Sequence, residues 1–174
     1  KFVSKLDSMF SMGYYWHGNE PCHQVAFLYN YAGQPWKTQK EVRQIMEHEY
    51  HLGANGLSGN DDAGQMSAWY IFAAMGFYPV CPGSSYYILA SPSFDKVTIQ
   101  LEDGKSFVIK AQNASADNVY VQSVLFNGVP YSKNYLLHSD IAAGGELEFV
   151  MGNEPNLEWG SSLELIVLPI YFWN

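Results

Sequence analysis

The chain contains a polar turn that leads directly into an apolar segment, Gly59-Asn60-Asp61-Asp62-Ala63-Gly64-Gln65-Met66-Ser67-Ala68-Trp69-Tyr70. Residues 63–77 carry no charge and have no polar face, so they predict a helix that is buried on most sides. Asp61 and Asp62 precede this helix, where Asp is a common cap and where the helix dipole favours negative charge. A single residue is enough for a cap, however, so two adjacent carboxylates could equally form a functional site. This stretch alone leaves both interpretations open.

The helical pattern extends over the first eighty residues. Apolar residues recur at a helical spacing in three further segments, 2–10, 25–32 and 42–46. Thr38 and Glu41 have the spacing of a capping box and predict the start of the helix that contains the third segment, and Gly53 is its expected end. The helix after the polar turn is expected over residues 62–75, with Gly76 as its end.

The pattern changes after two prolines near residue 80. Strand-like segments with alternating or β-branched residues lie at 87–89, 97–101, 107–109, 119–124 and 146–151. The turns at 102–104 and 127–128 separate some of these segments, which favours an antiparallel β-sandwich. A helical block followed by a strand block predicts an α+β chain with two packed domains, residues 1–80 and 81–174.

Composition excludes some classes of partner. The formal charge is −8 and Arg43 is the only arginine, so nucleic acid and anionic membrane surfaces are not expected partners. The apolar segment 163–173 is too short to span a bilayer, and we interpret it as one or two strands. The two cysteines, Cys22 and Cys81, lack metal-binding spacing, and the sequence leaves open whether they form a disulfide. Because the chain starts at Lys1 without an initiator Met, we expect it to be part of a longer protein.

A second polar cluster occupies a turn before another helical segment, Tyr15-Trp16-His17-Gly18-Asn19-Glu20-Pro21-Cys22-His23-Gln24. The oxygen donors of Asn19 and Glu20 suit Ca²⁺ better than zinc. An aromatic side chain beside acids and amides is also typical of a sugar subsite. The alternative is a simple helix start with proline in its first turn. In a barrel of helical hairpins, both polar clusters would lie on one rim and could form a single site.

Four motifs in this order resemble glycoside hydrolase family 92: the cluster from His17 to His23, the segment Leu28-Tyr29-Asn30-Tyr31-Ala32-Gly33 with Pro35 and Lys37-Thr38, the polar turn from Gly59 to Tyr70, and Gly76-Phe77-Tyr78-Pro79. The resemblance covers about residues 1–160. It implies a calcium-dependent exo-α-mannosidase that inverts the anomeric carbon, best known for α-1,2 linkages. It also implies that residues 1–80 are the last helices of a catalytic (α/α)6 barrel and that residues 81–174 are the C-terminal β-domain.

The resemblance implies roles for individual residues. Asp62 is the expected general base, and Asp61 is either the base instead or a partner or cap. Asn19 and Glu20 are the expected Ca²⁺ ligands. The mannose ring would stack on Trp16 and be oriented by His17 and His23. The general acid of the family lies upstream, in a part of the protein that this chain lacks, so we predict that the chain alone is inactive.

Two other functions stay open. Residues 81–174 could be a carbohydrate-binding or structural β-domain without catalysis, because their aromatic content permits sugar binding and also fits strand cores. The chain could also derive from a glycoside phosphorylase with a related (α/α)6 barrel, but the sequence lacks a basic or Ser-rich phosphate loop. A mannose-containing glycan is the expected substrate, and a periplasmic or secreted location suits an enzyme that degrades glycans. The tripeptide Asn113-Ala114-Ser115 fits an N-glycosylation acceptor.

Overall fold

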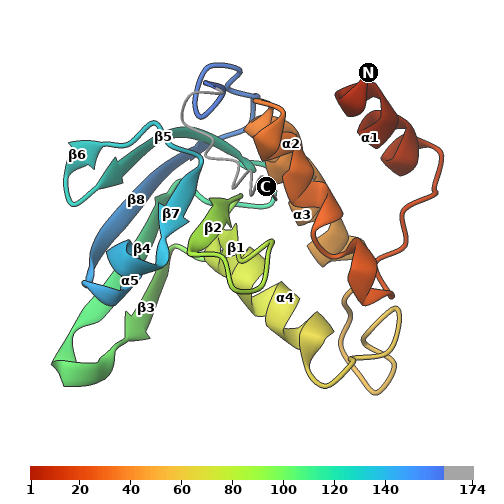
Figure 1. The fold of residues 1–174 in the computed structure, drawn as a ribbon, viewed down its shortest axis with the longest axis horizontal. Coiled ribbons are helices and arrows are strands. Elements are labelled where there is room, and N and C mark those ends of the chain that lie inside the picture. The colour runs from red at the N-terminus through yellow and green to blue at the C-terminus, as the bar shows by residue number, and fades with distance from the viewer. Residues whose placement is uncertain (163–174) are drawn as a thin grey trace, which may run out of the picture.

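The structure is a computed structural model, and it describes residues 1–162. The helices that precede the strands in the chain gather on one side of the molecule, and the two β-sheets lie on the other (Figure 1). The helical half contains, in chain order, α1 (Phe2–Ser11), the 3-10 turns η1 (Glu20–Cys22) and η2 (Val25–Phe27), α2 (Leu28–Tyr31), α3 (Pro35–His48) and α4 (Gln65–Met75). The predicted α+β organisation, with helices first and strands after, is therefore confirmed.

The predicted start of α3 is wrong. The helix begins at Pro35, which occupies the first turn, where a missing N–H is tolerated. Thr38 lies inside the helix and is buried, and its Oγ1 donates a hydrogen bond to the carbonyl of Ala26 at 2.8 Å. The helix ends at His48, five residues before Gly53, so that glycine belongs to the following loop.

The apolar helix α4 begins later than predicted but ends where expected. Three consecutive residues before it, 62–64, have positive φ angles, which excludes them from a right-handed helix. Gly76 ends the helix with φ +95°, as the sequence predicted. Trp69 is fully buried, whereas Tyr70 is 38% and Ile71 58% exposed. Within the described residues, α4 is therefore buried on one face only and not on most sides.

The strands form two sheets. The first sheet has the order β1-β2-β7 and is antiparallel, with strands β1 (Phe77–Tyr78), β2 (Tyr86–Leu89) and β7 (Tyr135–Leu137). The second has the order β3-β4-β8-β5-β6, with strands β3 (Lys96–Gln100), β4 (Ser106–Gln112), β5 (Tyr120–Phe126), β6 (Val129–Pro130) and β8 (Gly145–Gly152). Two short helical elements, η3 (Glu102–Gly104) and α5 (His138–Ala142), connect strands.

The second sheet is mixed, which corrects the expectation of a purely antiparallel one. Strand β4 pairs in parallel with β8, whereas the other pairs in the sheet are antiparallel. The intervening chain includes β5, β6, β7 and α5, so this long connection can return the chain in the parallel sense. The hairpin between β5 and β6 turns at Asn127 and Gly128 with φ +50° and +77°, and this predicted turn is confirmed.

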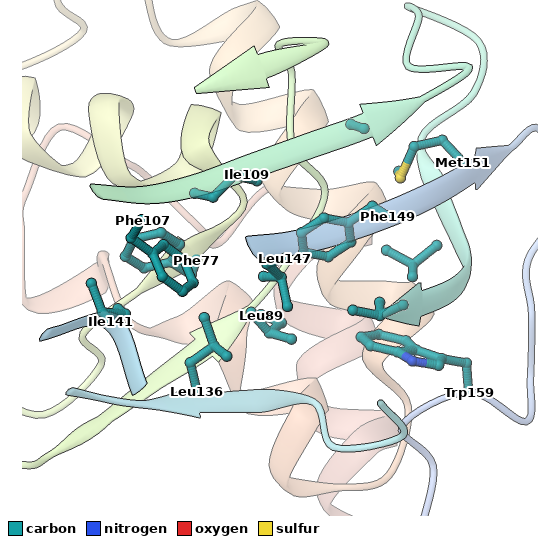
Figure 2. Close-up of a cluster of buried hydrophobic side chains, with 13 residues drawn as sticks. Phe77, Leu89, Phe107, Ile109, Leu136, Ile141, Leu147, Phe149, Met151 and Trp159 are labelled. Atoms are coloured by element: carbon teal, nitrogen blue, oxygen red, sulfur yellow. The ribbon is translucent and has the colours of Figure 1, made fainter. Parts of the chain in front are cut away.

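The first sheet is the middle layer of the described molecule, because its strands bury side chains on both faces. Phe77, Leu89 and Leu136 point toward the second sheet, where they meet Phe107, Ile109, Leu147 and Phe149 (Figure 2). Their neighbours along the strands, Tyr78, Ile88 and Tyr135, pack instead against the helices. The alternation of side chains in a strand explains this double contact.

The division of the chain at residue 80 stays a prediction. Strand β1 precedes this position and pairs with β2, which follows it.

No helix in the described residues is long and apolar enough to cross a membrane. The strands that we expected in residues 163–173 lie outside the described residues.

Candidate functional site

The two polar clusters of the sequence lie against each other through a pair of glycines. A Cβ atom added to Gly59 would lie 2.2 Å from the carbonyl oxygen of Gly18, and one added to Gly18 would lie 3.0 Å from the Cα of Gly59. We call this close approach of Gly18 and Gly59 the glycine contact. Only glycine permits two backbones to approach this closely. The contact brings the loop before η1 and the loop before α4 together at one end of the helical half.

The glycine contact places two carboxyl groups side by side. Glu20 follows Gly18 at the start of η1, and Asp62 follows Gly59 in the loop before α4. A hydrogen bond to Asp62 and the negative charge of Asp62 raise the pKa of Glu20 above its ordinary value. Neither carboxyl group has a salt bridge to a basic side chain within the described residues. We call Glu20 and Asp62 the carboxylate pair.

Asp61 has a different environment from Asp62. Its Oδ1 accepts hydrogen bonds from the backbone N–H of Ser67 at 3.0 Å and from the Ser67 hydroxyl at 2.9 Å. Its carbonyl oxygen also accepts from the N–H of Met66 at 3.1 Å. Asp61 therefore caps the first turn of α4, which is the structural interpretation that the sequence offered for one of the two carboxylates. Asp62 is exposed and is not used in this cap.

The backbone that presents Asp62 is unusual. Asp62 and Ala63 have φ +50° and +57°, in the left-handed region, and Gly64 follows with φ +95°. A non-glycine residue in this region typically costs about 1–2 kcal/mol, although Asp tolerates it better than Ala. Such conformations often occur at functional sites, where the surrounding structure maintains them.

His17 is fully buried beneath the glycine contact. Its Nδ1 lies 2.7 Å from the hydroxyl of Tyr15 and its Nε2 lies 2.6 Å from the hydroxyl of Tyr50. Burial and the neighbouring His23 lower its pKa to about 3, so the ring is neutral. Both ring nitrogens are occupied within the chain. This environment suits a residue that holds the loop in place, and direct contact of His17 with a sugar stays a prediction.

His23 is also buried and is hydrogen-bonded on both sides. Its Nε2 donates to the carbonyl of His17 at 2.9 Å, and its Nδ1 accepts from the Gln65 amide at 3.2 Å. Burial lowers the pKa of His23. The same Gln65 amide nitrogen lies 2.9 Å from the hydroxyl of Tyr78. His23 thus joins the first loop to the first turn of α4, and its role in substrate binding stays a prediction.

A pocket of about 370 Å³ opens beside the carboxylate pair. Its lining includes Glu20 together with Gln24, Gln65, Phe72, Tyr78 and Pro82. Trp16 is 54% exposed, and its ring lies over Gly18, where an added Cβ would come within 2.4 Å of it. An exposed ring that lies over the glycine contact is available to stack on a sugar.

Sequence reasoning assigned no role to two polar residues near the site, Gln65 and Tyr50, whereas Tyr15 already belonged to the second polar cluster. Gln65 and Tyr50 bond the two buried histidines, and Tyr15 completes the hydrogen bonds of His17. Tyr50 lies 33 residues from His17 in the sequence, so no local pattern connects them. Unlike Tyr50, Gln65 had a local signal in the sequence, because it lies in the first turn of the apolar helix, directly after the polar turn.

The donor set fits a hard divalent cation but is incomplete within the chain. The described residues contain no cluster of three or more His, Cys, Asp or Glu side chains that could hold a metal ion. Yet the carboxylate pair and the neighbouring exposed Asn19 offer oxygen donors without a competing basic group. Oxygen donors of this kind are those that Ca²⁺ prefers. Further ligands would have to come from water, substrate or other parts of the protein.

The two cysteines are both free in the structure. Cys22 lies in η1 and is partly buried, whereas Cys81 is exposed in the turn before β2. Within the described residues they form no disulfide, which answers the question that the sequence left open.

Comparisons with known proteins agree on one family. The profile of the glycosyl hydrolase family 92 catalytic domain matches residues 1–153. A family GH92 α-mannosidase from Bacteroides thetaiotaomicron, also solved in complex with mannoimidazole, superposes with a TM-score of 0.93 at 44% identity, over 98% of this chain and 24% of that chain. A family GH92 inverting mannosidase from strain VPI-5482 of the same species superposes with a TM-score of 0.83 at 45% identity, over 93% and 21% of the two chains.

A relative from a eukaryote matches the same region. An uncharacterized secreted glycosidase from Arthroderma benhamiae is 34% identical over 164 residues, which are 92% of this chain and 21% of that protein. The chain therefore spans at most about a quarter of the length of these relatives. Since the family profile covers most of the described residues, the chain belongs to glycosyl hydrolase family 92.

Proposed function

We propose that the protein containing this chain is an inverting, calcium-dependent exo-α-mannosidase that releases mannose from α-1,2-linked glycans. Family membership and the mannosidase relatives support this reaction. The observation that carries the site assignment is the carboxylate pair, which the glycine contact brings together on two separate loops. The substrate is a mannose-containing glycan, and the remainder of the active site comes from other parts of the protein.

Asp62 is the general base in this proposal. An inverting glycosidase needs a carboxylate that removes a proton from water while the water attacks the anomeric carbon. Asp62 is exposed, whereas Asp61 is occupied as the cap of α4. The left-handed backbone at Asp62 and Ala63 keeps both residues outside helix α4. The choice between the two aspartates therefore favours Asp62.

Asn19 and Glu20 hold the calcium ion in this proposal, with Asp62 close enough to contribute an oxygen. A bound Ca²⁺ would neutralise the repulsion between the two carboxylates and polarise sugar hydroxyl groups without any proton transfer. Trp16 provides the exposed ring on which the sugar stacks. His17 and His23 act from below by fixing the loop that carries these groups.

The general acid lies outside this chain in our proposal, so the chain alone has no mannosidase activity. The two carboxyl groups of an inverting pair stand roughly 6.5–9.5 Å apart to admit the water molecule. Glu20 lies near enough to Asp62 for that carboxylate to raise its pKa, and we assign Glu20 to the calcium ion and not to the role of the acid. A periplasmic or secreted location suits this activity, and the secreted fungal relative supports it.

The test uses the full-length protein and α-1,2-mannobiose. We expect release of mannose that a calcium chelator abolishes and added CaCl₂ restores. The variant Asp62→Asn should lower kcat by about 10³-fold or more, because the amide cannot accept the proton. Asp61→Asn is the matched control and should retain most of the activity and the stability, because the amide oxygen can still accept the two Ser67 hydrogen bonds. Full activity of Asp62→Asn together with an inactive Asp61→Asn would reverse the assignment.

A further inference from the structure

A chain of hydrogen bonds connects the two loops of the site from below. The hydroxyl of Tyr50 donates to the carbonyl oxygen of Met66 at 3.0 Å. Tyr50 has a single hydroxyl hydrogen, so the contact of 2.6 Å with His17 must be donated by the histidine Nε2–H. The Nδ1 atom of His17 is then an acceptor, and it receives the hydroxyl hydrogen of Tyr15 at 2.7 Å. All three bonds thus have one defined direction.

Each end of this series of hydrogen bonds lies close to a residue of the site. His17 precedes Gly18, which makes the glycine contact, and the Asn19–Glu20 segment follows directly. Met66 lies in the first turn of α4, and its N–H donates to the carbonyl of Asp61 at 3.1 Å. Tyr50 comes from a third segment, the loop that follows α3. Its hydroxyl therefore ties the loop of Glu20 to the helix turn that fixes the loop of Asp62.

The ring of Tyr50 is held independently of its hydroxyl. It is parallel to the indole of Trp69, with ring centroids 6.0 Å apart and an angle of 3° between the planes. The ring of His17 meets the same indole edge-on at 4.3 Å. Phenylalanine at position 50 would keep this stacking and lose only the two hydrogen bonds. The substitution consequently separates the role of the hydroxyl from the role of packing.

We propose that the Tyr50 hydroxyl is a positioning group that sets the distance between the Asn19–Glu20 segment and Asp62. The glycine contact allows the two loops to touch, but Gly18 and Gly59 supply no side chains that could fix how they slide against each other. The hydrogen bonds of Tyr50 to His17 and Met66 supply this restraint together with the bond between His23 and Gln65. Groups that orient catalytic or metal-binding residues in this way commonly change affinity or activity by 10- to 100-fold when removed.

The first test is independent of any activity. Hydrogen exchange is measured in the full-length protein for peptides that cover residues 16–22 and 58–66, in the wild type and in Tyr50→Phe. We expect at least tenfold faster exchange in both peptides. The matched control is Tyr131→Phe, which removes a hydroxyl that donates to the carbonyl of Tyr135 at 2.7 Å in the β-half. This control should leave both peptides unchanged, and unchanged exchange in Tyr50→Phe would overturn the proposal.

The second test rests on the proposed mannosidase function. Tyr50→Phe should lower the affinity for CaCl₂, measured by titration calorimetry, by about tenfold, and lower kcat by a similar factor. The KM for α-1,2-mannobiose should change less than threefold, because no sugar contact is removed. A merely structural role would lower thermal stability, as in Tyr131→Phe, and leave kcat and calcium affinity intact. That result would also overturn the proposal.

A failure of the Tyr50 proposal can be distinguished from a failure of the proposed function. If Tyr50→Phe does not fold, Tyr15→Phe removes the other hydrogen bond of His17 and should accelerate exchange of residues 16–22 specifically. Unchanged exchange in that variant counts against the proposal. If the wild type cleaves no mannoside, the proposed function fails, but the exchange experiment still decides whether Tyr50 sets the position of the loops.

Discussion

The substitution Gly59→Ala should push apart the two loops that meet at the glycine contact, and the structure gives the size of this displacement. The new Cβ would lie 2.2 Å from the carbonyl oxygen of Gly18, 2.5 Å from its Cα and 2.6 Å from its carbonyl carbon. All three are backbone atoms, so no side chain can rotate away. Ordinary van der Waals contact begins at 3.4 Å, and the two loops must therefore separate by about 1.2 Å.

This separation predicts a larger loss of catalysis than of stability. Glu20 follows Gly18 and Asp62 follows Gly59 along the chain, so the relative position of the two side chains changes by about the same distance. A misplacement of about 1 Å can lower a rate by about 100-fold. Overpacking of this kind costs about 1–3 kcal/mol of unfolding free energy when the structure can relax. We therefore expect a folded enzyme with kcat for α-1,2-mannobiose reduced by about two orders of magnitude.

The assay compares kcat at saturating CaCl₂ with the urea midpoint of the full-length protein. Gly104→Ala is the matched control: it adds the same methyl group in the β3–β4 turn, where no atom lies within 4 Å of the new Cβ. Because Gly104 has φ +72°, the control should lose about 1 kcal/mol of stability and no activity. A Gly59→Ala enzyme with kcat within threefold of the wild type would refute the reasoning, since the loops would then tolerate separation.

Two further predictions concern stability. The pKa of about 3 for buried His17 means that, as the pH falls, the unfolded chain binds a proton at this position before the folded one does. His17 should therefore contribute a loss of about 1.4 kcal/mol of unfolding free energy for each pH unit as the pH falls from about 6.5 to 3. Urea unfolding of His17→Asn should show a flatter pH dependence than the wild type, the exposed His48→Asn should not, and equal slopes would contradict the assignment. Arg43 donates to the carbonyl of Pro92 at 3.0 Å and to the carbonyl of Ser115, so it joins α3 to two loops of the β-half. Arg43→Ala should lower the unfolding free energy by about 2–3 kcal/mol. Arg43→Lys should recover less than half of this loss, because an ammonium group lacks the planar fork of donors of a guanidinium group. An unchanged urea midpoint for Arg43→Ala would exclude a stabilising connection between α3 and the β-half through Arg43.

Local signals in the sequence predicted those elements whose ends depend on a single residue. Gly76 ends α4, and the Asn127–Gly128 dipeptide turns the β5–β6 hairpin, because both positions need a left-handed backbone that these residues adopt at little cost. Thr38 misled the prediction for α3. Its hydroxyl bonds the buried carbonyl of Ala26 from another segment, so a residue with a capping pattern serves in a tertiary contact.

Long-range features were beyond the sequence. The parallel pairing of β4 with β8 joins residues 38 positions apart, such as Phe107 and Gly145, and alternation within either strand is the same for both directions of pairing. Similarly, the sequence marked His17 and His23 as polar groups in a turn. It could not show that Tyr50 and Gln65 would enclose them, since the environment of a histidine depends on neighbours that are distant in the chain.

The site is where the chain departs most from its local preferences, and these departures depend on one another. Asp62 and Ala63 adopt left-handed angles, and Glu20 lies beside a like charge. Each departure is unfavourable alone, and a chain without compensation would relax by moving the two exposed loops apart. The buried contacts below them, in which Trp69 packs against His17 and donates its Nε1–H to the carbonyl of His23 at 2.9 Å, oppose that relaxation. The apolar helix that first distinguished the sequence is therefore the support that holds the two adjacent carboxyl groups in place.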